Sequence, residues 1–94
     1  MPGMLHVLAY DITDDRRRRQ IVKRMEGIGR RVQESVFETF MTSGQIRRAV
    51  HELQTQLMPT EGDSLRVYRV CSSCAAHRLR IGGVSVEWDG DIIL

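Results

Sequence analysis

The segment from Met4 to Tyr10 is a short and nearly continuous run of apolar residues, and it constrains the fold more than any other part of the chain. Asp11 and a Thr13-Asp14-Asp15 cluster end the run, so its length and composition predict a strand. Alternate residues of a strand point to opposite faces, and both sets are largely apolar here. Because such a strand needs cover on both sides, we expect it at the centre of a sheet.

A first helix is predicted over residues 14–28. Its apolar residues recur at helical spacing, at Ile21, Val22, Met25 and Ile28. Thr13 or Asp14 fits the N-cap position, because a short side-chain oxygen there accepts from a free backbone N–H. Gly27 and Gly29 mark the end of the helix.

A second helix is predicted over residues 45–57, which carry the most regular apolar stripe of the chain. The stripe is formed by Ile46, Ala49, Val50, Leu53 and Leu57. Thr42 and Gln45 fit a capping box before it, and Pro59 is expected to stop it. His51 lies off the stripe, so we expect its side chain to be exposed.

Residues 31–41 lie between the two helices and are rich in β-branched and aromatic side chains. They are predicted to be extended, either as one bent strand or as a tight hairpin near Ser35–Glu38. In one continuous strand, Gln33, Ser35 and Phe37 share a face. A face of this mixed character indicates a functional surface, although an irregular edge strand explains it equally well.

Three shorter extended segments follow the second helix. Residues 64–71 and 78–81 are predicted strands, and Val84, Val86 and Trp88 alternate as in a third. Residues 92–94 are apolar and need a surface to pack against, for which the sheet of another protomer is a natural candidate.

The order of these elements is β-α-β-β-α-β, which is typical of an α+β fold of the ferredoxin-like kind, with one antiparallel sheet and two helices on one face. We assign residues 1–82 to this domain and residues 83–94 to a C-terminal tail that packs on the sheet edge of the same or the partner protomer. A chain of 94 residues has a thin core, which favours support from a second subunit. The uncovered face of the sheet therefore predicts a homodimer with two-fold symmetry, stacked sheet to sheet.

Charge is distributed unevenly, although the formal net charge is only +2. Residues 16–31 hold eight of the 14 basic residues and a single acid, Glu26, whereas residues 83–94 hold three acids and no base. A basic stripe indicates a polyanionic partner such as nucleic acid, and a solvated charged helix explains it about equally well. The candidate nucleic-acid-binding residues are Arg16, Arg17, Arg18, Arg19 and Arg31.

Asp11 ends the predicted central strand just before a helix, where polar side chains of strand ends converge. An Asx turn into the helix is the more common explanation for an aspartate in this position. If the first strands of two copies meet, however, two Asp11 carboxylates approach each other and need a proton or a cation between them. Mg²⁺ or Mn²⁺ would fit and would support phosphodiester hydrolysis. Arg18 lies on the apolar stripe of the first helix, so we expect it over the strand end near Asp11.

The remaining motifs mainly exclude functions and locations for the protein. Cys71-x-x-Cys74-x-x-His77 offers three zinc ligands, but a single CxxC pair is more typical of ordinary thiols. The chain contains no Gly-rich phosphate loop, GxSxG or HExxH motif, which leaves most enzyme classes without their residues. Neither a membrane-spanning apolar run nor a signal peptide is evident, so we expect a cytoplasmic location.

Three segments resemble one known family. They are YDITDD at 10–15, followed by a basic helix, GRRVQESVFE at 29–38, and DSLRVY at 63–68. Together they are similar to the small CRISPR-associated endonuclease family, the smaller protein of the CRISPR spacer-acquisition pair. The similarity covers about the first 70 to 80 residues.

The resemblance implies a ferredoxin-like homodimer in antiviral defence that binds nucleic acid and holds a divalent metal, Mg²⁺ or Mn²⁺. Asp11 would be the metal ligand and the catalytic residue. The supporting residues of the cleft would be Tyr10, Arg18, Arg31, Ser35 and Phe37. Gln20 departs from the family pattern, because some relatives carry Arg at that helix position.

Two functions of different classes follow. The first is a metal-dependent endonuclease, cutting RNA or DNA through Asp11, that acts with the larger integrase in spacer acquisition. The second is a non-catalytic DNA-binding scaffold that bridges the integrase dimers through the arginine-rich helix and the tail. A small-molecule sensor on a ferredoxin-like fold is a third interpretation.

Overall fold

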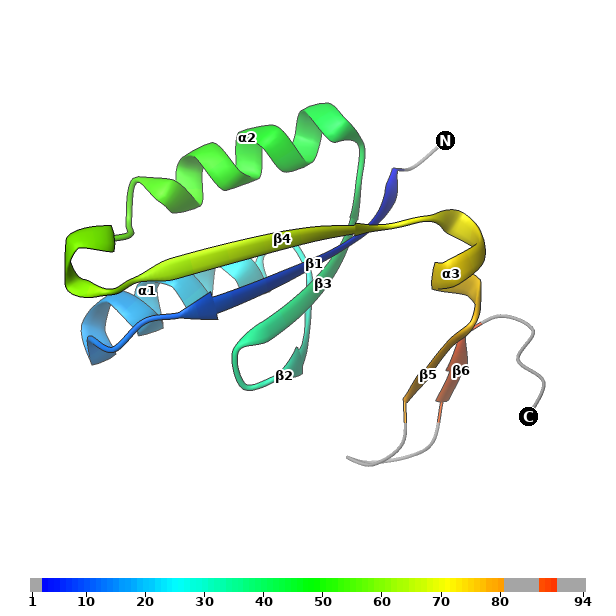
Figure 1. Cartoon of the computed structure of the whole chain (residues 1–94), viewed down its shortest axis with the longest axis horizontal. Helices are drawn as coiled ribbons and strands as arrows, with labels where there is room; N and C mark the ends of the chain where they lie inside the picture. The colour runs from blue at the N-terminus through cyan, green and yellow to red at the C-terminus, as the bar shows by residue number, and fades with distance from the viewer. Residues whose placement is uncertain (1–2, 81–86, 90–94) are drawn as a thin grey trace.

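The computed structural model of the chain describes residues 3–80 and 87–89. The helices and strands, labelled in Figure 1, are β1 (Met4–Asp11), α1 (Asp15–Glu26), β2 (Arg30–Gln33), β3 (Val36–Met41), α2 (Ser43–Gln54), β4 (Ser64–Val70), α3 (Ser72–Ala76), β5 (Arg78–Arg80) and β6 (Glu87–Asp89). A short 3-10 turn, η1 (Pro59–Glu61), lies between α2 and β4. The predicted α+β order is therefore present, with α3 added between β4 and β5.

Strand β1 lies at the centre of an antiparallel sheet with the order β2-β3-β1-β4, as its two apolar faces predicted. It pairs with β3 on one side and β4 on the other, so Leu8 lies between Phe37 and Val67. Strands β5 and β6 form a separate two-stranded antiparallel sheet.

Helices α1 and α2 cover one face of the four-stranded sheet. Seven buried residues join the two layers: Leu8, Tyr10, Ile12, Ile21, Met25, Phe37 and Leu53. Three come from the even-numbered positions of β1 and its extension and one from β3, while Ile21 and Met25 come from α1 and Leu53 from α2. The core therefore lies between the helices and one side of β1.

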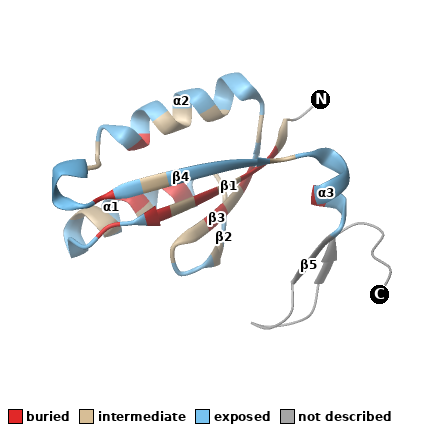
Figure 2. Cartoon of the chain, viewed as in Figure 1, coloured by how far each residue is buried: buried red, intermediate tan, exposed pale blue. Residues whose placement is uncertain are grey.

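The opposite side, which we call the open face, carries Leu5, Val7 and Ala9 of β1 with their neighbours on β3 and β4. Leu5 is buried, and α3 contacts β1 and has one buried residue, Ala75. Phe40 and Tyr68 are 56% and 52% exposed on this face. Figure 2 shows the outer strand β4 as mostly exposed. One part of the open face thus leaves apolar side chains uncovered.

Capping residues that the sequence predicted lie at the ends of both long helices. Asp14 caps α1 by accepting from the backbone N–H of Arg17, and Gly27 is its C-cap. The predicted capping box of α2 is present, with Thr42 and Gln45 bonded to each other's backbone. This helix ends at Gln54, earlier than the predicted position 57, and Pro59 instead begins η1.

Residues 31–41 form the hairpin β2–β3 rather than one bent strand, and Glu34 and Ser35 make the turn. The prediction that Gln33, Ser35 and Phe37 share a face is therefore wrong. Phe37 is buried against the helices, Gln33 pairs with Val36, and the register shifts between Arg31 and Gln33. A turn reverses the chain, so alternation is not continuous across it.

Helix α3 was not predicted, because its five residues are too few to show a helical period. The predicted strands at 64–71 and 78–81 are present as β4 and β5, and β6 covers part of the alternating segment. Residues 83–86 and 90–94 of the predicted tail lie outside the described residues, so the packing of the tail stays a prediction.

Candidate functional site

Asp11 is the last residue of β1 and its side chain is exposed. It follows Leu5, Val7 and Ala9 in alternation, which places it on the open-face side of the strand, opposite Ser64 of β4. Its carboxylate makes no hydrogen bond or ion pair with any residue in the described part of the chain. The Asx-turn alternative is therefore not observed, and Asp14 caps the helix instead.

The three neighbouring aspartates are engaged within the chain. Asp14 accepts from the Arg17 backbone N–H at 2.9 Å, Asp15 pairs with Arg18, and Asp63 pairs with the Arg17 side chain. Of the four aspartates Asp11, Asp14, Asp15 and Asp63, Asp11 alone has both carboxylate oxygens free for an external ligand.

Arg17 corrects the prediction that residues 16–19 form one nucleic-acid-binding surface. Its side chain is only 15% exposed, and its Nε and Nη2 donate to the Asp63 carboxylate at 2.8 and 3.2 Å. The Asp63 side chain is fully buried and also accepts from the Met58 backbone N–H at 2.9 Å. The Arg17 hydrogen bond, followed by that from Met58, lowers the pKa of Asp63 below its ordinary value. Arg17 therefore holds the loop that precedes β4, which contains Asp63, against α1.

Arg18 lies over the end of β1, as its position on the apolar stripe of α1 predicted. Its Nη1 donates to the Ile12 carbonyl oxygen at 3.0 Å, and Nη2 pairs with Asp15. The charged partner is thus Asp15 rather than Asp11. Because a backbone carbonyl fixes one nitrogen, the guanidinium is held beside the strand end.

A basic groove, which we call the α1–β2 groove, has a volume of about 500 Å³. Its lining residues are Tyr10, Arg18, Arg19, Val22, Lys23, Glu26, Arg31 and Glu34. Four of these are basic and two are acidic, and the Glu34 carbonyl oxygen accepts from Tyr10 Oη at 2.9 Å and from Arg31 Nη2 at 2.6 Å. The groove is cationic, and the Glu34 backbone fixes two of its side chains.

The structure brings together some of the predicted cleft residues and separates others. Tyr10, Arg18 and Arg31 line the same groove. Ser35 meets Tyr10 through the backbone, with its carbonyl oxygen 3.1 Å from the Tyr10 nitrogen, while Phe37 belongs to the core. Asp11 is not among the lining residues, because adjacent residues of a strand point to opposite faces.

Lys23 also lines the α1–β2 groove, although it is not among the nucleic-acid-binding residues predicted from the sequence. It lies one turn after Arg19 on α1, so spacing alone could have joined the two. Arg16 is exposed and lies outside the groove. The cationic surface is therefore formed by Arg18, Arg19, Lys23 and Arg31.

The CxxC pair opens α3, with Cys71 as the N-cap residue, and both thiols are free and exposed. The Ser73 hydroxyl, followed by Cys74, lowers the pKa of Cys71 to about 7, and Cys71 in turn raises the pKa of Cys74. His77 Nδ1 lies 2.6 Å from the Ser73 carbonyl oxygen. Within residues 3–80 and 87–89, no group of three or more His, Cys, Asp or Glu side chains is placed to hold a metal.

Helices long and apolar enough to cross a bilayer are also absent from the described ranges.

Comparison with known proteins gives one consistent family. The family model described as CRISPR associated protein Cas2 matches residues 4–78. A protein of Chloroflexus aurantiacus named CRISPR-associated endoribonuclease Cas2 1 is 44% identical over 92 residues, which cover 97% of this chain and 99% of that protein.

Solved structures share the fold. Streptococcus pyogenes Cas2 superposes with a TM-score of 0.70 and 27% identity, covering 85% of this chain and all of that one. A chain of a partial Cas6-RT-Cas1–Cas2 complex gives a TM-score of 0.68 at 24% identity, covering 86% of this chain and 91% of that one. The α+β fold and the resemblance in the sequence are thus confirmed.

Proposed function

The chain belongs to the CRISPR associated protein Cas2 family, and from this premise we propose that it is a metal-dependent endonuclease of CRISPR spacer acquisition that acts as a homodimer. One observation carries the proposal: the Asp11 carboxylate, on the open-face side of the central strand, has no partner among the described residues. A free carboxylate at a strand end is suited to catalysis rather than to structure.

The homodimer follows from the open face. Its exposed aromatic side chains, Phe40 and Tyr68, lie beside Leu5 and Val7 in the strand register. A second copy stacked on this face would bury them, and a two-fold axis would bring both Asp11 residues to the same interface. Two like charges in one site favour a cation between them.

The donor set of this dimer fits a hard divalent cation. Each chain supplies one exposed carboxylate, Asp11, and carboxylate oxygens with water are the ligands that Mg²⁺ and Mn²⁺ prefer. When bound, such a cation lowers the pKa of a coordinated water and stabilises charge on a phosphodiester. Asp14, Asp15 and Asp63, the aspartates that lie near the same end of β1, are engaged within the chain.

The α1–β2 groove would hold the nucleic-acid backbone. Arg19 and Lys23 are exposed on α1, and Arg31 faces them from β2. Guanidinium groups bind phosphate oxygens through two parallel hydrogen bonds, which positions a strand without reading its sequence. The relatives are named endoribonucleases, and RNA is accordingly the first substrate to test.

Purified protein should cleave RNA in the presence of Mg²⁺ or Mn²⁺, and the D11N variant should lose at least a hundredfold in rate, the usual weight of a catalytic carboxylate in such a role, about 10²–10⁴. The measurement is single-turnover cleavage of a labelled RNA and a labelled DNA, with and without EDTA. E52Q, which removes an exposed carboxylate of α2, is the matched control and should cleave at the wild-type rate. Cleavage that survives in D11N would reject Asp11 as the catalytic residue.

The second candidate function is a DNA-binding scaffold that joins the larger integrase to the DNA fragment. The cationic groove favours it independently of Asp11, because phosphate contacts require no carboxylate. A chain with the same fold was solved within a complex that also contains Cas1, so such an assembly is compatible with the fold.

The scaffold function is tested by the salt dependence of DNA binding. R19Q removes one groove cation and should reduce the slope of log K against log salt by about 0.7–0.9 for a lost phosphate contact. R24Q changes the same charge on a part of α1 outside the groove and should leave the slope unchanged. Equal slopes for wild type and R19Q would show that Arg19 in the groove contacts solvent rather than a DNA phosphate.

A further inference from the structure

A second and larger groove lies on the helix-covered side of the sheet, between α2 and the strands β1 and β4. Its volume is about 840 Å³, within the range of small-molecule sites, about 300–1,000 Å³. It reaches the start of β1 at Met4, whereas Asp11 is at the end of that strand. We call it the α2–β4 groove, and it shares no lining residue with the α1–β2 groove.

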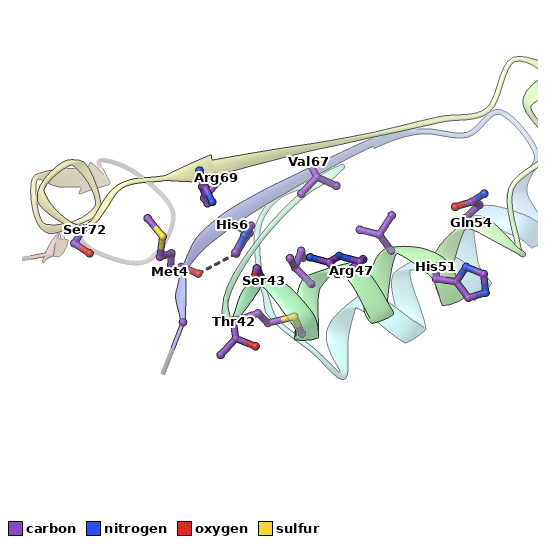
Figure 3. A pocket seen from close by; sticks show the side chains of 14 residues that line it. Met4, His6, Thr42, Ser43, Arg47, His51, Gln54, Val67, Arg69 and Ser72 are labelled. Carbon is purple, nitrogen blue, oxygen red and sulfur yellow. Dashed lines mark hydrogen bonds between the residues drawn. The ribbon is translucent and has the colours of Figure 1, made fainter. Parts of the chain in front are cut away.

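The ionisable side chains of this groove are all basic. Arg47 and His51 come from α2, Arg69 from β4 and His6 from β1, and the lining residues include no Asp or Glu. Neither Arg47 nor Arg69 has an ion pair or hydrogen bond with another residue in the described part of the chain. Figure 3 shows His6 and Arg69 projecting from the strands toward α2, where Arg47 lies along the helix. The groove therefore has an unbalanced positive charge.

His6 forms the buried polar centre of the groove. Its side chain belongs to a residue that is only 4% exposed, and Nδ1 lies 2.9 Å from the Met4 carbonyl oxygen. A carbonyl oxygen only accepts, so Nδ1 carries the hydrogen, and Nε2 is left without a partner among the described residues. A buried ring nitrogen without a partner is uncommon, because buried polar atoms are nearly always hydrogen-bonded.

The strand register places Arg69 directly opposite His6 on the same face of the sheet. In the sheet His6 pairs with Arg69 of β4 and with Thr39 of β3, and the same groove is lined from α2 by Arg47 and, at the start of the helix, by the hydroxyl-bearing Thr42 and Ser43. An oxyanion between them would accept hydrogen bonds from both guanidinium groups. A phosphate oxygen near Nε2 would form a hydrogen bond with it. The proton of that bond would come either from a phosphate hydroxyl, which donates to neutral Nε2, or from Nε2–H of the imidazolium, which donates to the phosphate oxygen.

Part of the groove is apolar. Ile46 and Val50 line it from α2, and Val67 lines it from β4 although it is 37% exposed. Val67 is on the helix-covered face, so its exposure shows that α2 leaves this part of the sheet uncovered. A ligand for the whole groove therefore needs an anionic group and an apolar or aromatic body.

We propose that the α2–β4 groove binds a small phosphate monoester with an aromatic body, of the nucleoside monophosphate class, with the phosphate held between His6, Arg47 and Arg69. The site goes beyond the proposed nuclease function, because it uses none of the residues assigned to that function. The protein would therefore have a small-molecule binding site that is separate from its proposed nucleic-acid-binding groove.

The test is calorimetric titration of the full-length protein with AMP and UMP, and with adenosine and uridine as uncharged counterparts. The D11N variant serves as a second background, so that binding is scored without cleavage. We expect the monophosphates to bind in both backgrounds, and at least tenfold more tightly than the nucleosides, since charge-assisted contacts of this kind are the strong ones.

R47Q and R69Q should each weaken monophosphate binding at least tenfold, while R48Q, the next residue on α2 and outside the groove, should not. Arginine variants carry the test because both side chains are exposed, whereas His6 is part of the packed interior. Thermal unfolding of each variant checks that the fold is retained.

Three results would overturn the proposal. Equal weakening by R48Q would show a general charge effect, and binding of oligonucleotides without binding of monophosphates would make the groove part of a nucleic-acid surface. Monophosphate binding that appears only in a chain lacking residues 90–94 would assign the groove to that acidic and apolar segment instead. Loss of nuclease activity in D11N with no effect on monophosphate binding would leave this site standing.

Discussion

At the scale of single residues, four consecutive arginines of α1 have three different roles. Arg16 and Arg19 are exposed, Arg17 turns inward to the buried Asp63, and Arg18 binds the carbonyl oxygen that follows β1. Successive helical residues are separated by about 100°, so a run of like charges cannot act as one surface. The basic stripe is therefore partly structural and partly available to a ligand.

The Arg17–Asp63 pair predicts a specific dependence of stability on pH. The folded pKa of Asp63 is below its ordinary value, so its carboxylate stabilises the fold above about pH 4, its unfolded pKa, and this stabilisation is lost as the pH falls through the folded pKa. D63N should unfold at lower urea than wild type at pH 7, and the difference should shrink toward pH 2. Urea titrations across this range measure it.

D15N is the control for that experiment, because Asp15 makes an exposed ion pair with Arg18 and should change stability little. A double variant, R17Q with D63N, should recover part of the loss, because it leaves no unpaired charge in the site. A difference between D63N and wild type that stays constant with pH would contradict the role of the charged carboxylate.

At the scale of elements, α2 depends on its first turn more than on the burial of its stripe. Only Leu53 of this helix is fully buried, and the other stripe residues within it, Ile46, Ala49 and Val50, are half-buried. The capping box supplies partners for two groups at the helix start: Gln45 N–H donates to Thr42 Oγ1 at 3.1 Å, and Thr42 N–H donates to Gln45 Oε1 at 2.9 Å. A helix that covers the sheet incompletely has little packing to compensate for a lost cap.

T42A should therefore lower the free energy of unfolding by about 1 kcal/mol, the typical value for a lost N-cap side chain. Urea denaturation followed by circular dichroism gives the value. T13A, an exposed threonine before α1 that caps no helix, should have a much smaller effect. Equal losses in the two variants would mean that the capping box contributes nothing specific.

At the scale of the whole molecule, the two faces of the sheet are covered to different extents. Helices α1 and α2 bury the residues of one face, whereas on the other face Phe40 and Tyr68 are exposed. Exposed apolar patches are typical of interaction surfaces, and the homodimer proposed above would cover this one.

F40D should weaken the proposed homodimer at least about tenfold, because a buried aromatic side chain contributes about 1.5–3 kcal/mol and a buried unpaired carboxylate is unfavourable. Light scattering over a concentration series measures the mass. M58D changes an exposed apolar residue before η1 that belongs to none of the strands of the open face, and should leave the mass unchanged. A wild-type protein that is monomeric at all concentrations would remove the basis for a metal shared by two Asp11 residues.

The sequence by itself determined the features that depend on neighbouring residues. Apolar residues on both sides of Met4–Tyr10 predicted a central strand, and the Thr42 and Gln45 pair predicted the start of α2. These signals are local, since periodicity and capping involve residues within a few positions of each other. The family resemblance, which implied a metal-binding and catalytic role for Asp11, rests on short motifs of the same kind.

Only the tertiary structure decided which side chains meet across the chain. Arg17 turns away from solvent because Asp63, 46 residues later, lies buried beside it. Helical periodicity and capping relate residues only a few positions apart, so they could not predict this pair. The turn at Glu34 and Ser35 reversed the expected faces and placed Arg31 beside Tyr10. Long-range contacts of this kind depend on how sheet and helices pack together, so the folded chain rather than its periodicity fixes both grooves.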